Sequence, residues 1–434
     1  MKTLTLRLTL TPTLAATLAP LPDNPYFTPF KPTTAPEYHS SYLQKGDRLA
    51  ICGDSITEQK MYSRIIETYL TACTPELEIT VRQYGWSGER APGFLNRMTN
   101  DVLRFHPTIA TTCYGMNDHR YVPYTDAIGE EYRTTSQAII QSFKHHHVRV
   151  VQGSAGPVGK MPHWVQSATG TVTDLNLNLL NLRNIDIDLA ETENVRFADV
   201  FLPMFVQGFE AQQQWGTNYM VPGQDGVHPG WAGQTIMAYA FLKAMGLSGE
   251  IGTFTVDLAQ GTATASSGHQ ILQADKTHIT VNSSRYPFCA TGATNDDNSI
   301  RSGMTLVPFN QDLNRLTLIA KNTTAPTYTV TWGKTSKTYS ATQLQHGINL
   351  AADFETNPFS TAFNQLDDAV AKKQAYETRQ IKDLFHGPEG RTNPDLTAQL
   401  TEQVRSPLAH AIQHALQPLQ HTISLTPRDS AAQR

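Results

Sequence analysis

The stretch LAICGDSITEQ, residues 49–59, decides the fold, because an apolar segment runs into a glycine and then into a helical pattern. Residues 48–53, RLAICG, are a predicted strand, and residues 56–72 are a predicted helix with its apolar side chains on one side. A strand that is apolar throughout, followed by a helix, is typical of a parallel sheet covered on both faces. The stretch also places Ser55 where the strand meets the helix.

The same alternation continues to about residue 247. Four further apolar segments are predicted strands: 78–85, 108–115, 148–154 and 195–200. Predicted helices lie between these strands and after the last one, at 91–105, before His145, at 171–191 and at 231–246. This order predicts an α/β fold with a parallel sheet between two layers of helices. Ligands of such sheets bind beyond the carboxyl ends of the strands.

The pattern changes near residue 249. Residues 250–352 contain short Thr- and Val-rich segments with turn residues between them, which predict an antiparallel β-sandwich. The segments are GTFTVD, HITVN, MTLVPF, LTLIAKN, YTVTWG and KTYS. Residues 353–434 are predicted to be a C-terminal helical segment and tail, with a long amphipathic helix at 357–385 that we expect to pack back on the first domain.

Composition narrows the possible functions. The 434 residues are 39% hydrophobic and 17% charged, with a formal net charge of −4, so a large core is feasible. We find no dense Lys/Arg patch and therefore expect no nucleic-acid partner. No run of about 18 apolar residues predicts a transmembrane helix. The four cysteines have neither zinc-site nor redox-pair spacing, and the three adjacent histidines 145–147 cannot face one ion, so we expect neither metal nor cofactor.

The N-terminus resembles an export signal. Residues 1–20 carry early basic residues, then a Leu/Thr/Ala stretch, then small residues before Pro20. We therefore expect a secreted or periplasmic protein. A Pro/Thr-rich linker to about residue 36 would precede the first domain, at 37–248. The oligomeric state stays open.

Ser55 has two interpretations that are compatible. In SITE, residues 55–58, the serine and Glu58 have the spacing of a capping box, with Ser55 as the helix cap. A serine at the end of a strand and the start of a helix also lies near backbone N–H groups and the helix dipole, which stabilise developing negative charge. We expect Ser55 to be both cap and nucleophile.

Three further segments follow predicted strands or precede the last helix: GWSGER at 85–90, YGMNDHR at 114–120 and DGVHPGWAG at 225–233. Each alone has an ordinary structural explanation, as a glycine turn, a helix cap or a loop. The alternative is that Gly88 lets a backbone N–H approach a ligand, that Asn117 supplies an amide donor, and that Asp225 holds the imidazole of His228.

Taken in order, GDSIT, the glycine turn, GMND and DGVHP resemble the four blocks of the SGNH hydrolases, also called the GDSL esterase/lipase family. The resemblance covers residues 48–247 and implies a three-layer, flavodoxin-like α/β/α fold. It implies that Ser55 is the nucleophile, His228 the general base and Asp225 the partner of His228.

The resemblance also implies an oxyanion hole made by the Ser55 N–H, the Gly88 N–H and the Asn117 side chain. Asp54 and Asp118 would organise the loops around it. The expected target is an ester, hydrolysed through an acyl-enzyme without a cofactor.

Aromatic residues near the blocks bear on the substrate. We expect Trp86, Tyr114 and His119 to contact it; other rings in the neighbouring loops are Tyr121, Trp164, Trp215 and Tyr219. An export signal, an appended sandwich and aromatic residues in the loops favour removal of acetyl groups from a carbohydrate. The alternative of a lipase or small-ester hydrolase rests on apolar residues in the loops at 155–170 and 201–224: Met161, Trp164, Phe201, Met204, Phe205 and Phe209. A polysaccharide-binding protein with a vestigial hydrolase domain is the third alternative.

Overall fold

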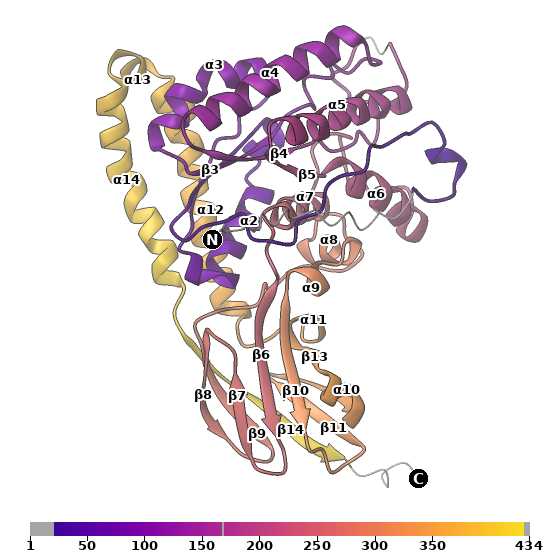
Figure 1. The fold of residues 1–434 in the computed structure, drawn as a ribbon, viewed down its shortest axis with the longest axis vertical. Coiled ribbons are helices and arrows are strands. Elements are labelled where there is room, and N and C mark those ends of the chain that lie inside the picture. Colours follow the sequence, from indigo (N-terminus) through magenta and orange to yellow (C-terminus); the bar gives the residue numbers. More distant parts are fainter. Residues whose placement is uncertain (1–20, 167–168, 429–434) are drawn as a thin grey trace, which may run out of the picture.

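The computed structural model describes residues 21–166 and 169–428. The predicted export signal, at 1–20, therefore lies outside the described residues. In Figure 1 an α/β unit lies above a β-sandwich, and a pair of long helices runs along one side of the α/β unit. No helix among the described residues is long and apolar enough to cross a membrane.

The α/β unit is built on a five-stranded parallel sheet with the order β2-β1-β3-β4-β5. Its strands are β1 (Arg48–Gly53), β2 (Thr80–Gln83), β3 (Ile109–Cys113), β4 (Arg149–Gly153) and β5 (Arg196–Ala198). This order is the flavodoxin-like one. Alternate residues of β1 enter different cores, Leu49 and Ile51 on one face and Ala50 and Cys52 on the other, because both faces are covered.

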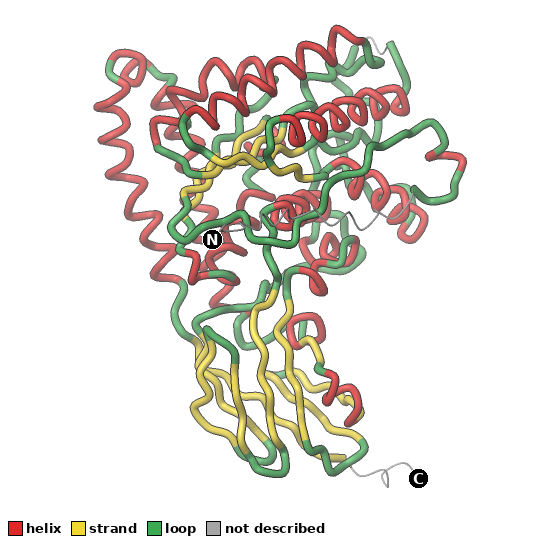
Figure 2. The backbone as a smooth tube through the Cα atoms, viewed as in Figure 1, coloured by secondary structure: helices red, strands yellow, loops and turns green. Residues whose placement is uncertain are grey.

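Helices cover both faces of the sheet, as the tube in Figure 2 shows. One layer contains α3 (Ala91–Asp101), α4 (Asp126–His145) and α5 (Val172–Thr192), and the other contains α2 (Tyr62–Cys73) and α7 (Trp231–Ala244). The short α1 (Ser55–Glu58) follows β1, and α6 (Phe201–Trp215) follows β5. The three-layer α/β/α prediction is confirmed.

The sandwich combines a mixed sheet with an antiparallel one. The mixed sheet has the order β13-β10-β6-β7 and the antiparallel sheet β12-β11-β14-β9-β8. Their strands are β6 (Glu250–Asp257), β7 (Thr262–Ala265), β8 (His269–Ala274), β9 (His278–Ser283), β10 (Arg315–Lys321), β11 (Thr327–Trp332), β12 (Thr335–Ser340), β13 (Ile348–Asn349) and β14 (Leu419–Arg428). The short helices are α8 (Ile300–Leu306), α9 (Phe309–Asp312), α10 (Ala341–His346) and α11 (Leu350–Asp353).

Two sequence expectations for the sandwich were wrong. MTLVPF, residues 304–309, was expected as a strand but forms the end of α8 and the start of α9, where Gly303 packs tightly against α7. The C-terminal tail was expected outside the sandwich, yet residues 419–428 form β14, a central strand between β11 and β9. Its buried Ile423 and Leu425 alternate with polar residues, so burial in the sandwich core explains the strand.

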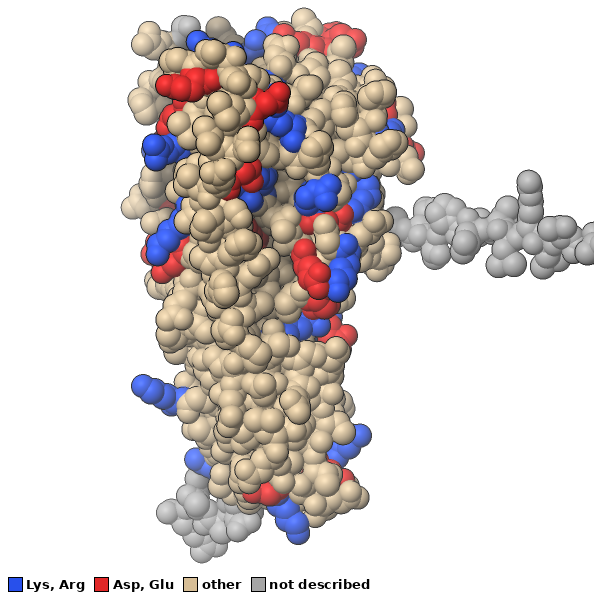
Figure 3. Space-filling model, turned by 90° about the vertical axis from the view of Figure 1, so that its left-hand side faces the viewer, with Lys and Arg blue, Asp and Glu red and all other residues tan. Residues whose placement is uncertain are grey.

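Residues 360–415, here called the arm, leave the sandwich, run along the α/β unit and return to the sandwich at β14. The arm consists of α12 (Ser360–Arg379), a π-helix (Gln380–Phe385), α13 (Pro388–Thr392) and α14 (Pro394–Ala415). The α12 helix packs on α2 and β2, as we expected for the helix at 357–385. On the arm side of the molecule, Figure 3 shows acidic and basic side chains interspersed over the upper part and mostly uncharged residues over the sandwich.

Candidate active site

Ser55 lies at the carboxyl end of β1, on the first residue of α1. Its Oγ is 2.8 Å from Nε2 of His228, which comes from the loop before α7, 173 residues later in the chain. Since β1 is a central strand of the parallel sheet, the two segments meet at the edge where ligands of such sheets bind.

Asp225 completes the chain of contacts. Nδ1 of His228 is 2.7 Å from Oδ2 of Asp225, and the other carboxylate oxygen accepts hydrogen bonds from the Val227 and His228 N–H groups at 2.9 and 2.8 Å. Partial burial opposes ionisation of Asp225, but these N–H donors and the imidazole hold its pKa below the ordinary value. An ionised Asp225 fixes the proton of His228 on Nδ1 and leaves Nε2 to accept from the Ser55 hydroxyl.

The cap of α1 is Asp54 and not Ser55, which corrects the capping-box prediction. Oδ1 of Asp54 accepts a hydrogen bond from the Ile56 N–H at 2.9 Å. Glu58 does not reach back to the serine; its carboxylate accepts from the Ser87 N–H at 2.5 Å and pairs with Lys382. The Ser55 hydroxyl faces His228 instead, and a residue one position earlier satisfies the helix end.

Gly88 and Asn117 lie on the loops that follow β2 and β3. Gly88 has φ = +74°, a conformation that favours glycine, and a Cβ built there would meet nothing within 4 Å. The Asn117 side-chain amide donates to the Glu89 carbonyl at 3.0 Å and lies 3.4 Å from Oδ2 of Asp54. Asp54 therefore links the Ser55 turn to the Asn117 loop.

Asp118 holds its own loop through both oxygens of its carboxylate. One carboxylate oxygen accepts from the Ala91 N–H and the other from the Gly115 N–H, both at 2.9 Å. Burial raises the pKa of Asp118 to about 6, and burial likewise raises the pKa of Asp54 to about 7. Both carboxyls are buried beneath the loops that carry Ser55 and Asn117.

The raised pKa of Asp54 predicts a pH dependence of stability. The folded carboxyl keeps a proton that the unfolded chain, with the ordinary value of 3.8, releases between about pH 4 and 7, so unfolding becomes easier as pH rises through that window. We expect wild-type stability to fall relative to Asp54→Asn by up to about 1 kcal/mol per pH unit there, and no further above it. Urea unfolding at pH 5, 6, 7 and 8 measures this, and parallel curves for the two proteins would contradict it.

Two of the three predicted substrate contacts are wrong. Tyr114 and His119 are buried, at 1% and 0% exposure, so neither offers an atom to a substrate. The Tyr114 hydroxyl donates to Glu89 at 2.8 Å, and Nδ1 of His119 hydrogen bonds to the Met116 carbonyl. Burial also lowers the pKa of His119 to about 4. Trp86 is half-buried, with the His386 ring 4.7 Å away.

Trp164 is the aromatic residue that the structure places beside the imidazole. Its ring centroid is 5.8 Å from that of His228, its side chain is 38% exposed, and Tyr121 lies edge-on at 6.2 Å. In the sequence, Trp164 is one of several loop aromatics, and no signal separates it from the others. Among the described residues, no group of three or more His, Cys, Asp or Glu side chains gathers as a metal site would require.

A parallel α/β sheet with a serine–histidine–aspartate chain at its carboxyl edge defines a serine hydrolase. Residues 51–236 match the model of the GDSL-like lipase/acylhydrolase family. This match agrees with the resemblance of the α/β domain to the SGNH hydrolases, and the protein is an ester-hydrolysing enzyme.

Solved structures extend the similarity of fold beyond this domain. A gut microbial diltiazem-metabolizing enzyme is 21% identical, with a TM-score of 0.71 over 90% of this chain and 100% of that one. The acetylxylan esterase Axe2 from Geobacillus stearothermophilus is 22% identical, with a TM-score of 0.39 over 47% of this chain and 96% of that one. No curated protein sequence matches the chain.

Proposed function

We propose that the protein removes acetyl groups from a carbohydrate through an acyl-enzyme on Ser55. The contact of 2.8 Å between Ser55 Oγ and His228 Nε2 carries the chemistry, because a serine hydroxyl is a poor nucleophile unless a base accepts its proton. Asp225, paired with His228 at 2.7 Å, keeps the imidazole in the required tautomer.

The reaction then proceeds in two halves. His228 accepts the Ser55 proton as Oγ attacks the ester carbonyl, and it returns that proton to the departing alcohol. The Ser55 and Gly88 N–H groups and the Asn117 amide donate to the oxyanion. A water molecule gives a proton to His228 as it adds to the acetyl-serine. The second oxyanion then collapses, His228 returns the proton to Ser55 Oγ, and acetate is released.

The exposed indole of Trp164 supports a carbohydrate substrate. A flat ring beside the catalytic imidazole, itself braced by Tyr121, is a surface on which a sugar face stacks. Three of the apolar residues behind the lipase alternative do not support it, because Phe201, Met204 and Phe205 are buried in the core on α6.

Substitution of Trp164 tests the carbohydrate part of the proposal. We expect Trp164→Ala to lower kcat/KM for an acetylated oligosaccharide by about fivefold to tenfold, because one stacked ring is lost. Turnover of p-nitrophenyl acetate, which has no sugar, should change by less than about twofold. Trp215→Ala is the matched control, since Trp215, at the end of α6, packs against Tyr219 with ring centroids 4.6 Å apart. Equal losses on both substrates would contradict a stacking role.

An acyl-chain series separates acetyl from longer esters. We expect acetate to be released from acetylated oligosaccharides and p-nitrophenyl acetate to be hydrolysed far faster than the octanoate. Faster hydrolysis of octanoate would identify a lipid esterase, and glycan binding without turnover would identify a vestigial hydrolase.

A further inference from the structure

We propose that two residues of the arm, Lys382 and His386, are positioning residues for the active-site loop at 85–88. This loop carries the Gly88 N–H, and the inference rests on the proposed function for the role of that group. Lys382 is separated from Glu58, its partner beside Ser55, by 324 residues in the chain.

The 85–88 loop depends on α1 for its position. Gly85 approaches α1 so closely that a Cβ there would lie 2.2 Å from the Glu58 nitrogen. The Trp86 N–H donates to the Gly53 carbonyl at 3.0 Å, and the Ser87 N–H donates to the Glu58 carboxylate at 2.5 Å. The exposed Gly88, one residue further, is therefore located by the Glu58 side chain.

Residues of the arm contact both Glu58 and the Trp86 ring of the loop. Nζ of Lys382 lies 2.7 and 2.9 Å from the two carboxylate oxygens of Glu58 and 5.2 Å from the centre of the Trp86 ring. The Lys382 and Glu58 side chains are only 26% and 21% exposed, so solvent screens the pair less than a surface pair. His386 packs on the same indole at 4.7 Å and is itself held by Asp101 at 2.8 Å.

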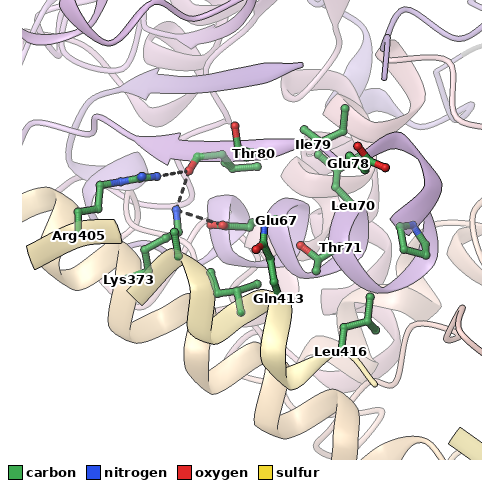
Figure 4. Close-up of a pocket in the computed structure, with 14 residues that line it drawn as sticks. Glu67, Leu70, Thr71, Glu78, Ile79, Thr80, Lys373, Arg405, Gln413 and Leu416 are labelled. Carbon is green, nitrogen blue, oxygen red and sulfur yellow. Dashed lines mark hydrogen bonds and ion pairs between the residues drawn. The ribbon is translucent and has the colours of Figure 1, made fainter. Parts of the chain in front are cut away.

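The backbone of the arm supports this role. Lys382 lies on the π-helix that follows α12, and π-helical turns inside helices are frequent at functional sites. Elsewhere on the arm, Lys373 and Arg405 both donate to the Val81 carbonyl of β2, at 2.6 and 3.1 Å. Figure 4 shows the two basic side chains reaching from the arm toward this strand, at a cavity of about 460 Å³. Because β2 leads directly into the loop, the arm contacts both the strand, at Val81, and the loop that follows it.

The consequence is a requirement for precision at the oxyanion. Without the cation, the Glu58 carboxylate loses the ion pair that holds it under the Ser87 N–H. Misplacement of a reacting or stabilising group by about 1 Å costs up to about 10²-fold in rate. Lys382 thus acts through Glu58 and Ser87 and does not touch the ester.

Lys382→Met tests the inference against a matched control. Asp367→Asn also removes an ion pair between the arm and α2, with partners 21% exposed, but it lies away from the loop. We expect Lys382→Met to lower kcat for p-nitrophenyl acetate about 10-fold to 100-fold with little change in KM, and Lys382→Arg to restore most of it. Asp367→Asn should keep kcat within about twofold of wild type, because it leaves the reacting groups in place.

Hydrogen exchange of the peptide covering 84–90 gives a readout that does not need turnover. We expect faster exchange in Lys382→Met and wild-type exchange in Asp367→Asn. If Lys382→Met and Asp367→Asn have the same kcat and the same exchange rate of the 84–90 peptide, the inference is overturned. If wild type lacks Ser55-dependent turnover, the proposed function fails instead, whatever the exchange shows. Should Lys382→Met not fold, Glu58→Gln removes the same ion pair and carries the same expectations.

Discussion

Ser55→Ala is expected to lower kcat for acetyl esters by about 10³-fold to 10⁶-fold while the fold survives. The loss is large because the covalent intermediate cannot form without Oγ. The free energy of unfolding should change by no more than about 1 kcal/mol, because the side chain makes one half-exposed hydrogen bond and Asp54 supplies the helix cap. Ester hydrolysis and urea unfolding of the same preparation measure the two effects.

Ser87→Ala provides the control for this variant. Ser87 is an exposed serine in the neighbouring loop, and its contact with Glu58 is made by the backbone N–H, which alanine retains. We expect its kcat to stay within about twofold of wild type. Activity of Ser55→Ala close to that of Ser87→Ala would refute Ser55 as the nucleophile.

Asp225→Asn is expected to have the second largest effect, lowering kcat by about 10³-fold to 10⁴-fold. An amide at this position no longer fixes the proton of His228 on Nδ1, so Nε2 is not reliably free to accept the Ser55 proton. KM should change little, because Asp225 contacts the imidazole and not the ester. Steady-state kinetics on p-nitrophenyl acetate separate the two parameters.

The chain contains its own matched control for Asp225. Asp275 and His278 repeat the same local arrangement in the sandwich: the carboxylate accepts from the His278 N–H at 2.9 Å and pairs with the imidazole, also at 2.9 Å. Asp275→Asn therefore removes an equivalent aspartate–histidine pair with no serine hydrolase site beside it. We expect it to leave kcat unchanged, and equal losses in the two variants would show that Asp225 acts only on stability.

These two aspartate–histidine pairs also show what can and cannot be predicted from the sequence. DGVH and DKTH have the same spacing, and only the position of the first before the last helix of the α/β pattern distinguishes them. The parallel sheet was predictable because its strands are buried on both faces and therefore apolar throughout. The pairing of Ser55 with His228 was implied by the resemblance to the SGNH hydrolases, and the structure brings the two side chains within 2.8 Å.

Other parts of the site were not predictable from local patterns. Ser55 and Asp54 both have side chains that cap helices, and only the position of His228 decides which of them faces the imidazole. Tyr114 and His119 stand next to the Asn117 block in sequence, yet the loop turns both side chains into the core. The partner of Glu58 could not be found either, since the π-helix that carries Lys382 has no signature of its own.

The tail illustrates the same limit for the fold. Leu419–Arg428 is a short segment of mixed polarity. It becomes a central strand because it pairs with β9 on one side and β11 on the other, and these two strands come from distant parts of the chain. Because β14 follows the arm, the sandwich anchors both ends of the segment that reaches the 85–88 loop. A bracing role for the sandwich is thus the expectation that the fold favours.

Peptide mapping after reaction with a p-nitrophenyl phosphonate tests the central claim most directly, because this reagent leaves a stable adduct on the activated nucleophile. We expect a single phosphonylated peptide that contains Ser55, and no adduct in Asp225→Asn on the time scale of wild-type labelling. Labelling at another residue, with ester hydrolysis lost in parallel, would contradict the account.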